Sequence, residues 1–373
     1  MVEINRRSFK DVDWLLLLAP IALVLLGCLG IISTEGAEAT RSSRLVGFSL
    51  FQKQLIALGI GVVIAIVVML TDYRKIIVVI APFFYAFVIV LLVLVLFVGV
   101  EIHGNRAWLN VAGFSLQPSE FAKVATILML ARYLSQPREG PLSIKDMAIM
   151  ALIAAPPIFL IFKEHDTGTM LTFGAILGSF YFVGGMRKTL LVIAILAVPI
   201  GLVAVYPHLR EYQRERIIVI IHPERADPKG YGYQTIQSMI AVGSGGMLGK
   251  GIGQGTQGSL GFLPFAHSDF VGAVIAEETG FTGVLLMMAL YLMLIWRLFA
   301  VASGSRERSG ALMIIGFIAL IAFHILCNLG MVVGLLPIMG IPLPLMSSGG
   351  TSIMSMFLCV GLALSVRLRR FVN

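Results

Sequence analysis

Apolar runs of 18 or more residues recur from one end of this 373-residue chain to the other. A helix of that length spans the hydrocarbon core of a bilayer. The composition agrees, since 58% of the residues are hydrophobic and 13% are charged, against about 25% charged in an average soluble protein. We therefore predict an all-α, polytopic membrane protein.

Ten transmembrane helices can be laid out at the usual length of about 20 residues. They are predicted at residues 14–33, 53–70, 76–100, 118–135, 147–163, 168–186, 188–206, 270–297, 309–330 and 349–367. The first run is too long for the apolar region of a signal peptide, and no small-residue cleavage site follows it. All ten spans belong to one integral membrane domain, residues 1–373.

The formal net charge of +8 is explained by topology rather than by nucleic-acid binding. With the N-terminus inside, most basic residues fall in cytoplasmic connections and most acidic residues in outer ones, as the positive-inside rule describes. The basic set includes Arg6, Lys10, Arg74, Lys75, Arg187, Lys188, Arg297, Arg306, Arg367, Arg369 and Arg370. We therefore expect both termini in the cytoplasm.

Residues 206–269 form the long interruption of the apolar pattern, between the seventh and eighth spans, and this topology places them outside. Loops of such length usually carry function or are disordered. A P-loop would need Gly at position 244 and Ser or Thr after Lys250, where the chain has Ser244 and Gly251. The G-x-G-x-x-G match at residues 253–258 lies outside the cell and lacks a strand–helix unit. We expect no nucleotide cofactor, and flexible backbone close to a ligand or the bilayer.

Two shorter outer segments have unusual content. Residues 101–120 suit an interfacial turn or a short amphipathic segment. Residues 331–350 contain three prolines, followed by Ser347 and Ser348, and resemble a re-entrant connection. Backbone of this kind lies at membrane depth only beside protein or a water-filled cavity.

Charged side chains inside predicted spans mark candidate sites. Glu120 and Lys123 are three residues apart and share a helix face. They form either a structural pair or a site in which Lys123 faces an anionic group in a cavity. Glu277 lies about two turns into the eighth span, so its burial requires a partner or a polar cavity. His324 and Asn328 share a face of the ninth span, where we expect a polar packing contact.

Asp269 is the strongest candidate for acid–base chemistry. It lies where the long loop meets the membrane, beside His267 and Ser268, and a partly desolvated carboxylate there is a better general base. Alternatively, Asp269 caps the N-terminus of the eighth span, a position that Asp favours. The cations of the loop suit a phosphate or diphosphate group, or else form a solvated charged face; they are Arg210, Arg214, Arg216, Arg225 and Lys250.

Several motifs together resemble a signature of the SEDS family (shape, elongation, division and sporulation). They are Gly104-Asn105-Arg106-Ala107-Trp108-Leu109, Leu116-Gln117-Pro118-Ser119-Glu120-Phe121-Ala122-Lys123, Gly243-Ser244-Gly245-Gly246, His267-Ser268-Asp269-Phe270, Glu277-Glu278-Thr279-Gly280, Asn328-Leu329-Gly330, Gly340-Ile341-Pro342-Leu343-Pro344 and Ser347-Ser348-Gly349-Gly350-Thr351. The match covers nearly the whole chain. The opening Asp13-Trp14 is more similar to RodA, the elongation member, than to FtsW, the division member.

The resemblance implies a ten-span peptidoglycan glycosyltransferase of the cytoplasmic (inner) membrane, which polymerises lipid II during cell elongation and shape maintenance. It also implies a class B penicillin-binding protein, a transpeptidase, as partner. By this resemblance Asp269 falls on the catalytic aspartate, and Asp166 on a polar position of the cavity. Two positions depart from the family: Phe265 replaces an acidic or polar residue, and Ser268 replaces Thr.

The implied chemistry is an inverting glycosyl transfer at the outer membrane surface. Asp269 would take the proton from the acceptor's 4-hydroxyl, which attacks the donor's anomeric carbon as undecaprenyl diphosphate leaves. A divalent cation, Mg²⁺ or Mn²⁺, could share the diphosphate charge, at a site that the sequence does not identify. The expected contacts with lipid II or the undecaprenyl-linked glycan are Trp108, Glu120, Lys123, Asp166, Arg210, Arg214, Arg216, Lys250, His267, Ser268, Glu277, Ser347 and Ser348.

Two rival functions fit the same topology. A lipid II flippase, or another lipid transporter, would carry charges through the membrane thickness, whereas the informative charges here gather toward the outer half. A scaffold without activity would tolerate the loss of Asp269.

Overall fold

The computed structural model describes residues 12–39, 49–102, 105–111, 114–138, 140–190, 192–193, 196, 207, 214, 218 and 231–370. Most of these residues are helical, and seven helices among them are long and apolar enough to cross a membrane. The seven are α1 (Trp14–Ala39), α2 (Leu50–Leu70), the continuous run of α3 (Tyr73–Lys75), η1 (Ile76–Ile80) and α4 (Ala81–Val98), α6 (Ile144–Lys163), α12 (Val271–Ser303), α13 (Arg308–Val332) and α14 (Gly350–Leu368). Two shorter helices, α5 (Pro118–Leu134) and α7 (Thr167–Val183), have 17 residues each.

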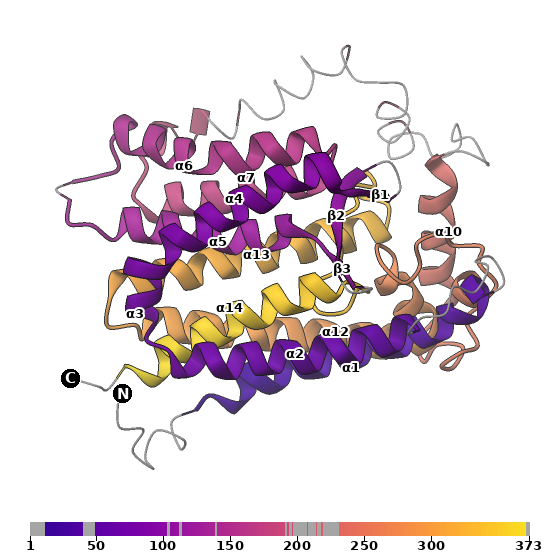
Figure 1. The fold of residues 1–373 in the computed structure, drawn as a ribbon. Coiled ribbons are helices and arrows are strands. Elements are labelled where there is room, and N and C mark those ends of the chain that lie inside the picture. Colours follow the sequence, from indigo (N-terminus) through magenta and orange to yellow (C-terminus); the bar gives the residue numbers. More distant parts are fainter. Residues whose placement is uncertain are drawn as a thin grey trace.

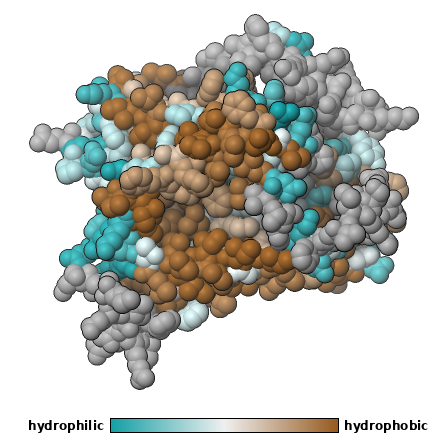
Figure 2. Space-filling model, in the orientation of Figure 1, coloured by the Kyte–Doolittle hydropathy of each residue, from teal (hydrophilic) through white to brown (hydrophobic). Residues whose placement is uncertain are grey.

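These helices coincide with nine of the ten predicted spans. The remaining one, predicted over residues 188–206, lies mostly outside the described residues. Apolar side chains cover the flanks of the helices, and hydrophilic residues gather toward the ends, as Figure 2 shows. The chain is thus an integral membrane protein.

The helices run side by side in one bundle, with α14 alongside α2 (Figure 1). Small residues allow this close approach, as is common between membrane helices. A Cβ atom on Gly361 of α14 would lie only 2.7 Å from the carbonyl oxygen of Ala65 on α2.

One end of the bundle is built around basic residues. Arg297 on α12 binds the buried Asp13 just before α1, and Arg369 after α14 donates to the carbonyl of Leu70 at the end of α2 (2.8 Å). The opposite end carries the Asp269 turn, defined here as residues 265–270, which directly precedes α12. Residues 271–297 of α12 (Val271–Ser303) lie between the Asp269 turn and Arg297, a length of about 40 Å at the rise of a helix.

The chain is mostly helical, as expected, but the region expected to be an interfacial turn or a short amphipathic segment, residues 101–120, contains strands. That region folds into an antiparallel three-stranded sheet of β1 (Val100–Ile102), β2 (Asn105–Val111) and β3 (Phe114–Leu116). Ala107 and Leu109 on β2 are buried, whereas Arg106 and Asn110 are exposed and Trp108 is half-buried, so a period of two buries one face. The alternation is too short to stand out in so apolar a sequence.

The region predicted as one long loop, residues 206–269, also contains helices. Its described part includes α10 (Tyr231–Ser244) and α11 (Thr256–Ser259). Residues Thr235, Ser238 and Ala241 form the buried face of α10, and the Ser238 hydroxyl donates to the carbonyl of Val332 on α13 (2.8 Å). The helix is thereby fixed beside the end of α13 that lies next to the Asp269 turn.

The glycine-rich loop, residues 245–255, fills a break in α12. At Gly280 the backbone has φ 66° and ψ −162°, which is not helical. The helix carbonyls of Glu277 and Glu278 accept instead from the amides of Lys250 and Gly251, both at 3.0 Å. These glycines therefore provide close backbone contact, as expected where no side chain can fit.

The connection between α6 and α7 buries a carboxyl group. Glu164 is 0% exposed, and neither of its carboxyl oxygens has a hydrogen-bond partner in the described part of the chain. Burial raises the pKa of Glu164 to about 8, and the neighbouring Asp166 carboxylate contributes in the same direction. Protonation is how a carboxyl group without a partner is tolerated in such surroundings.

Alanine substitutions should show the docking of the glycine-rich loop. Gly249 and Gly253 have nearly the same φ, 78° and 76°. A Cβ on Gly249 would lie 2.1 Å from the carbonyl oxygen of Glu278, whereas one on Gly253 meets nothing within 4 Å. Both substitutions carry the left-handed cost of about 1–2 kcal/mol, so the larger fall in thermal unfolding midpoint should be that of Gly249→Ala. Equal falls would contradict the docking.

The Glu164 carboxyl group should make stability depend on pH. Its pKa is higher in the folded state than in the unfolded chain, so its contribution is complete at low pH and is lost as pH rises toward about 8. The thermal midpoint of the parent should therefore fall between pH 5 and pH 8, and Glu164→Gln should flatten that fall. Glu101→Gln, which changes an exposed glutamate on β1, is the matched control and should leave the slope unchanged.

Candidate functional site

The start of α5 is fixed by contacts with the sheet and with α14. The hydroxyl of Thr351 on α14 donates to the carbonyl of Ser115 on β3 (3.0 Å) and accepts from the amide of Gln117 (3.2 Å). Proline at the first position of α5 suits a helix start. The first turns of α5, which carry Glu120 and Lys123, are therefore held against the core.

Glu120 and Lys123 form a buried ion pair. The ammonium group of Lys123 lies 2.7 Å from Glu120 Oε1, and their side chains are 0% and 3% exposed. The Ser355 hydroxyl on α14 lies 3.3 Å from the second carboxylate oxygen, Oε2. The prediction that the two residues share a face is confirmed, and the lysine points inward rather than to the membrane surface.

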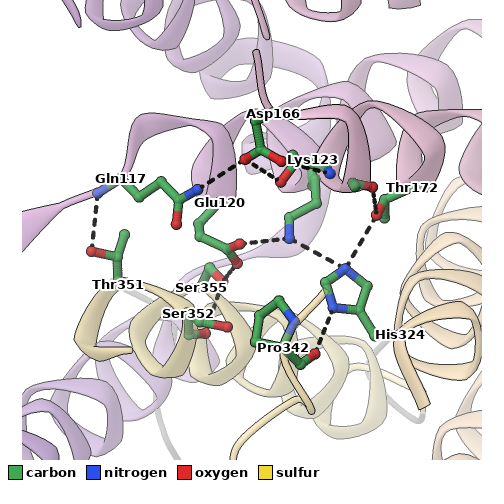
Figure 3. A network of polar contacts seen from close by, with 12 residues as sticks. Gln117, Glu120, Lys123, Asp166, Thr172, His324, Pro342, Thr351, Ser352 and Ser355 are labelled. Atoms are coloured by element: carbon green, nitrogen blue, oxygen red, sulfur yellow. Dashed lines mark hydrogen bonds and ion pairs between the residues drawn. The ribbon is translucent and has the colours of Figure 1, made fainter. Parts of the chain in front are cut away.

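His324 on α13 extends this cluster (Figure 3). Its Nε2 lies 3.4 Å from Lys123 Nζ and 3.4 Å from the Thr172 hydroxyl, and its Nδ1 lies 3.2 Å from the carbonyl oxygen of Pro342. A carbonyl accepts only, so Nδ1 carries the hydrogen and Nε2 accepts. The expected polar packing contact is confirmed, and it joins α5, α7 and α13.

Asp166 borders the same cluster from α7. It is the N-cap residue of α7 and accepts from the amide (3.0 Å) and the hydroxyl (2.7 Å) of Thr169. The side chain of Gln117 also donates to it (3.3 Å). Burial raises the pKa of Asp166 above its ordinary value, and the two bonds from Thr169 oppose that rise. Its position beside the Glu120–Lys123 pair is visible in Figure 3.

The Asp269 turn has its backbone held at three consecutive carbonyls. The carbonyl of His267 accepts from the amide of Ser348 (2.9 Å), and that of Ser268 from the Ser347 hydroxyl (2.5 Å). The carbonyl of Asp269 itself accepts from the side-chain amide of Asn328 (2.8 Å). The residues that supply these donors lie on α13 and on the α13–α14 connection, residues 333–349.

Asp269 does not occupy the N-cap position of α12. That position belongs to Phe270, and no side chain makes a capping bond there. The Asp269 side chain is half-buried. The N-cap alternative is therefore wrong, and the general-base role of Asp269 stays a prediction.

Lys250 and Glu277 are partners in this structure. Lys250 Nζ lies 2.7 Å from Glu277 Oε1. The same carboxylate accepts from the amides of Thr256 (2.7 Å) and Gln257 (3.1 Å) at the start of α11. Glu277 is 0% exposed, so the predicted need for a partner is met, and it fixes the glycine-rich loop beside α12.

The remaining predicted contacts lie on several elements or outside the described residues. Trp108 is half-buried on β2, and Ser347 is buried against the Asp269 turn. Arg214 donates to the carbonyl of Pro207, while Arg210 and Arg216 lie outside the described residues. In the described part of the chain, no group of three or more His, Cys, Asp or Glu side chains could hold a metal ion.

Polar residues outside the predicted set also support the site. The buried Gln54 on α2 donates to the carbonyl of Ser347 (3.2 Å), and Gln117 and Thr351 fix α5. Their types give no signal in a single sequence, because Gln and Thr are common in many roles. For Asn328 the sequence offered one indication: it lies four residues after His324 and therefore shares a helix face with it.

Comparison with known proteins places the chain in a family. The family model described as "Cell cycle protein", for FtsW, RodA and SpoVE, matches residues 13–370. "Peptidoglycan glycosyltransferase MrdB" of Escherichia coli (strain K12) is 35% identical over 371 residues, which cover 98% of this chain and 97% of that protein. "Stage V sporulation protein E" of Bacillus subtilis (strain 168) is 36% identical over 364 residues, covering 94% and 96%.

Solved structures agree with this placement. A chain from the structure described as "Structural coordination of polymerization and crosslinking by a peptidoglycan synthase complex" matches with a TM-score of 0.80 and 33% identity, over 97% of this chain and 99% of that chain. The Thermus thermophilus rod shape determining protein RodA matches with a TM-score of 0.70 and 28% identity, over 97% and 98%. Sequence and fold lead to one conclusion: the chain belongs to the FtsW/RodA/SpoVE family, the SEDS proteins.

Proposed function

We propose that this chain is a peptidoglycan glycosyltransferase that polymerises lipid II into glycan strands at the outer face of the cytoplasmic membrane, during cell elongation and shape maintenance. Relatives named peptidoglycan glycosyltransferase match over nearly its full length. The observation that carries the proposal is the Asp269 turn, whose three consecutive carbonyls are each held by a donor. A general base must be held in a fixed place to act on a bound hydroxyl.

In the proposed reaction Asp269 accepts the proton of the acceptor's 4-hydroxyl. The oxygen attacks the donor's anomeric carbon with inversion, and the bond to undecaprenyl diphosphate breaks. No nucleotide takes part. The leaving diphosphate gains negative charge, which favours cations close by. We assign that task to the cations of residues 206–250 and to a divalent ion, if one binds.

The buried Glu120–Lys123 pair has a structural role in the proposed site. Both side chains are closed off from solvent in this structure, so contact with a phosphate requires α5 or its neighbours to move. Breaking such a pair leaves an uncompensated buried charge and costs about 3–5 kcal/mol. We propose that the pair fixes the inner wall of the substrate site, with Asp166 above it.

The proposed topology has ten spans with both termini in the cytoplasm. The Asp269 turn then faces outward, because it lies at the other end of α12 from Arg297 and from the residues next to both termini. We further propose a class B penicillin-binding protein as partner, which agrees with the likeness to a chain of a peptidoglycan synthase complex.

Replacing Asp269 with Asn should abolish polymerisation of purified lipid II, because the amide cannot accept the proton. Glycan chains on gels are the readout, and the thermal midpoint should match that of the parent. The control is Asp72→Asn, an aspartate at the end of the bundle nearest the termini that caps α3, where asparagine caps equally well. Full activity of Asp269→Asn would overturn the assignment.

Reconstitution in liposomes separates the enzyme from the flippase. We expect labelled lipid II presented on the outer face to be converted to polymer. Movement of label across the bilayer without any polymer would favour the transporter. A scaffold would show neither activity, and cells would then tolerate the loss of Asp269.

A further inference from the structure

Asn328 lies on α13 at the point where the Asp269 turn meets the α13–α14 connection. Its side chain is 0% exposed. One side-chain nitrogen, Nδ2, lies 2.8 Å from the carbonyl oxygen of Asp269 and 2.9 Å from that of Ile341. Both neighbours only accept, so the nitrogen and not the oxygen must face them. One amide group therefore joins the backbone of Asp269 to the backbone of the connection.

His324 repeats this arrangement one helical turn away. Residues four apart lie on one face of a helix, and His324 Nδ1 lies 3.2 Å from the carbonyl oxygen of Pro342. Its other nitrogen contacts Lys123. Two side chains of α13 thus hold the consecutive carbonyls of Ile341 and Pro342. Asn328 also contacts the carbonyl of Asp269, and His324 also contacts Lys123 of the Glu120–Lys123 pair.

The connection that they hold passes close to the Asp269 carboxylate. Gly340 has φ 66°, and a Cβ placed on it would lie 4.0 Å from Asp269 Oδ2. A displacement of Ile341 would therefore change the surroundings of the carboxylate as well as the backbone that carries it.

We propose that Asn328 is a positioning residue for Asp269, and that with His324 it fixes the α13–α14 connection so that the Asp269 turn and the Glu120–Lys123 pair keep one relative geometry. This inference rests on the proposed function. Asn328 acts through Asp269 and the connection and need not touch substrate. Its loss should displace the base without removing it.

The test is a comparison of steady-state kinetics with purified full-length protein and lipid II. Asn328→Leu keeps the branching at Cγ and the number of side-chain heavy atoms, and it removes the donor to both carbonyls. We expect kcat to fall at least about tenfold with KM within about twofold of the parent, because a displacement of about 1 Å can cost about a hundredfold in rate. A thermal midpoint measured in parallel reports on folding.

Tyr291→Phe is the matched control. Tyr291 is buried on α12, and its hydroxyl donates to the carbonyl of Pro344 in the same connection (2.5 Å). Like Asn328, Tyr291 donates to a backbone carbonyl of the connection, but its bond does not involve the Asp269 turn. We expect its kcat to stay within about twofold of the parent, at a thermal midpoint lowered about as much as in Asn328→Leu.

A double substitution tests the link to His324. If Asn328 and His324 hold the same connection, the loss of one bond already displaces it. The loss of the second bond then has a smaller additional effect. The fall in kcat of Asn328→Leu combined with His324→Gln should therefore be at least about fivefold smaller than the product of the two single falls. Independent falls that multiply would overturn the shared role.

The outcomes separate the two proposals. If the parent polymerises lipid II and Asn328→Leu keeps kcat within about twofold, or loses no more than Tyr291→Phe, the positioning role is wrong and the proposed function stands. If the parent forms no polymer, the proposed function itself fails. Should Asn328→Leu not be recovered folded, Asn328→Asp replaces it, since it keeps the shape and offers at most one donor hydrogen. It should show the same loss of kcat at nearly constant KM.

Discussion

A backbone carbonyl that is buried away from water must find a donor, because an unpaired one costs about 1–3 kcal/mol. At the end of the bundle that carries the Asp269 turn, the requirement falls on an irregular segment. The carbonyls of His267, Ser268 and Asp269 take them from the α13–α14 connection and from α13. The conformation around Asp269 is therefore set by residues more than fifty positions further along the chain.

Burial also requires partners for the charged side chains of the interior. Removing a lysine and a glutamate from water is costly, and apolar residues of similar size would often stabilise a fold as well or better. The Glu120–Lys123 pair is nevertheless fully enclosed and linked through His324 to Pro342. We propose that this polar cluster serves the neighbouring site rather than the stability of the fold. The glycine-rich loop follows similar logic, since its amides replace helix bonds that α12 lacks at Gly280.

Much of the fold could be predicted, because apolar runs of bilayer length have few alternatives. The short sheet was missed, since alternation at Ala107 and Leu109 spans too few residues to compete with so apolar a background. Of the site, Asp269 and the Glu120–Lys123 pair could be placed from charge near or within spans, and from resemblance. The bond from the Ser347 hydroxyl to the Asp269 turn could not be predicted, because its partner is the backbone carbonyl of Ser268, 79 positions away. Long-range backbone contacts of this kind leave no local pattern.

The central claim is that the held Asp269 carboxylate acts on the acceptor sugar at the outer face of the membrane. A structure of the protein with a bound lipid II analogue tests this most directly. We expect the acceptor's 4-hydroxyl within about 3.2 Å of an Asp269 carboxylate oxygen, with the carbonyls of residues 267–269 still bound to Ser348, Ser347 and Asn328. A sugar bound at the other end of the bundle, or held away from Asp269 with no water between them, would contradict the account.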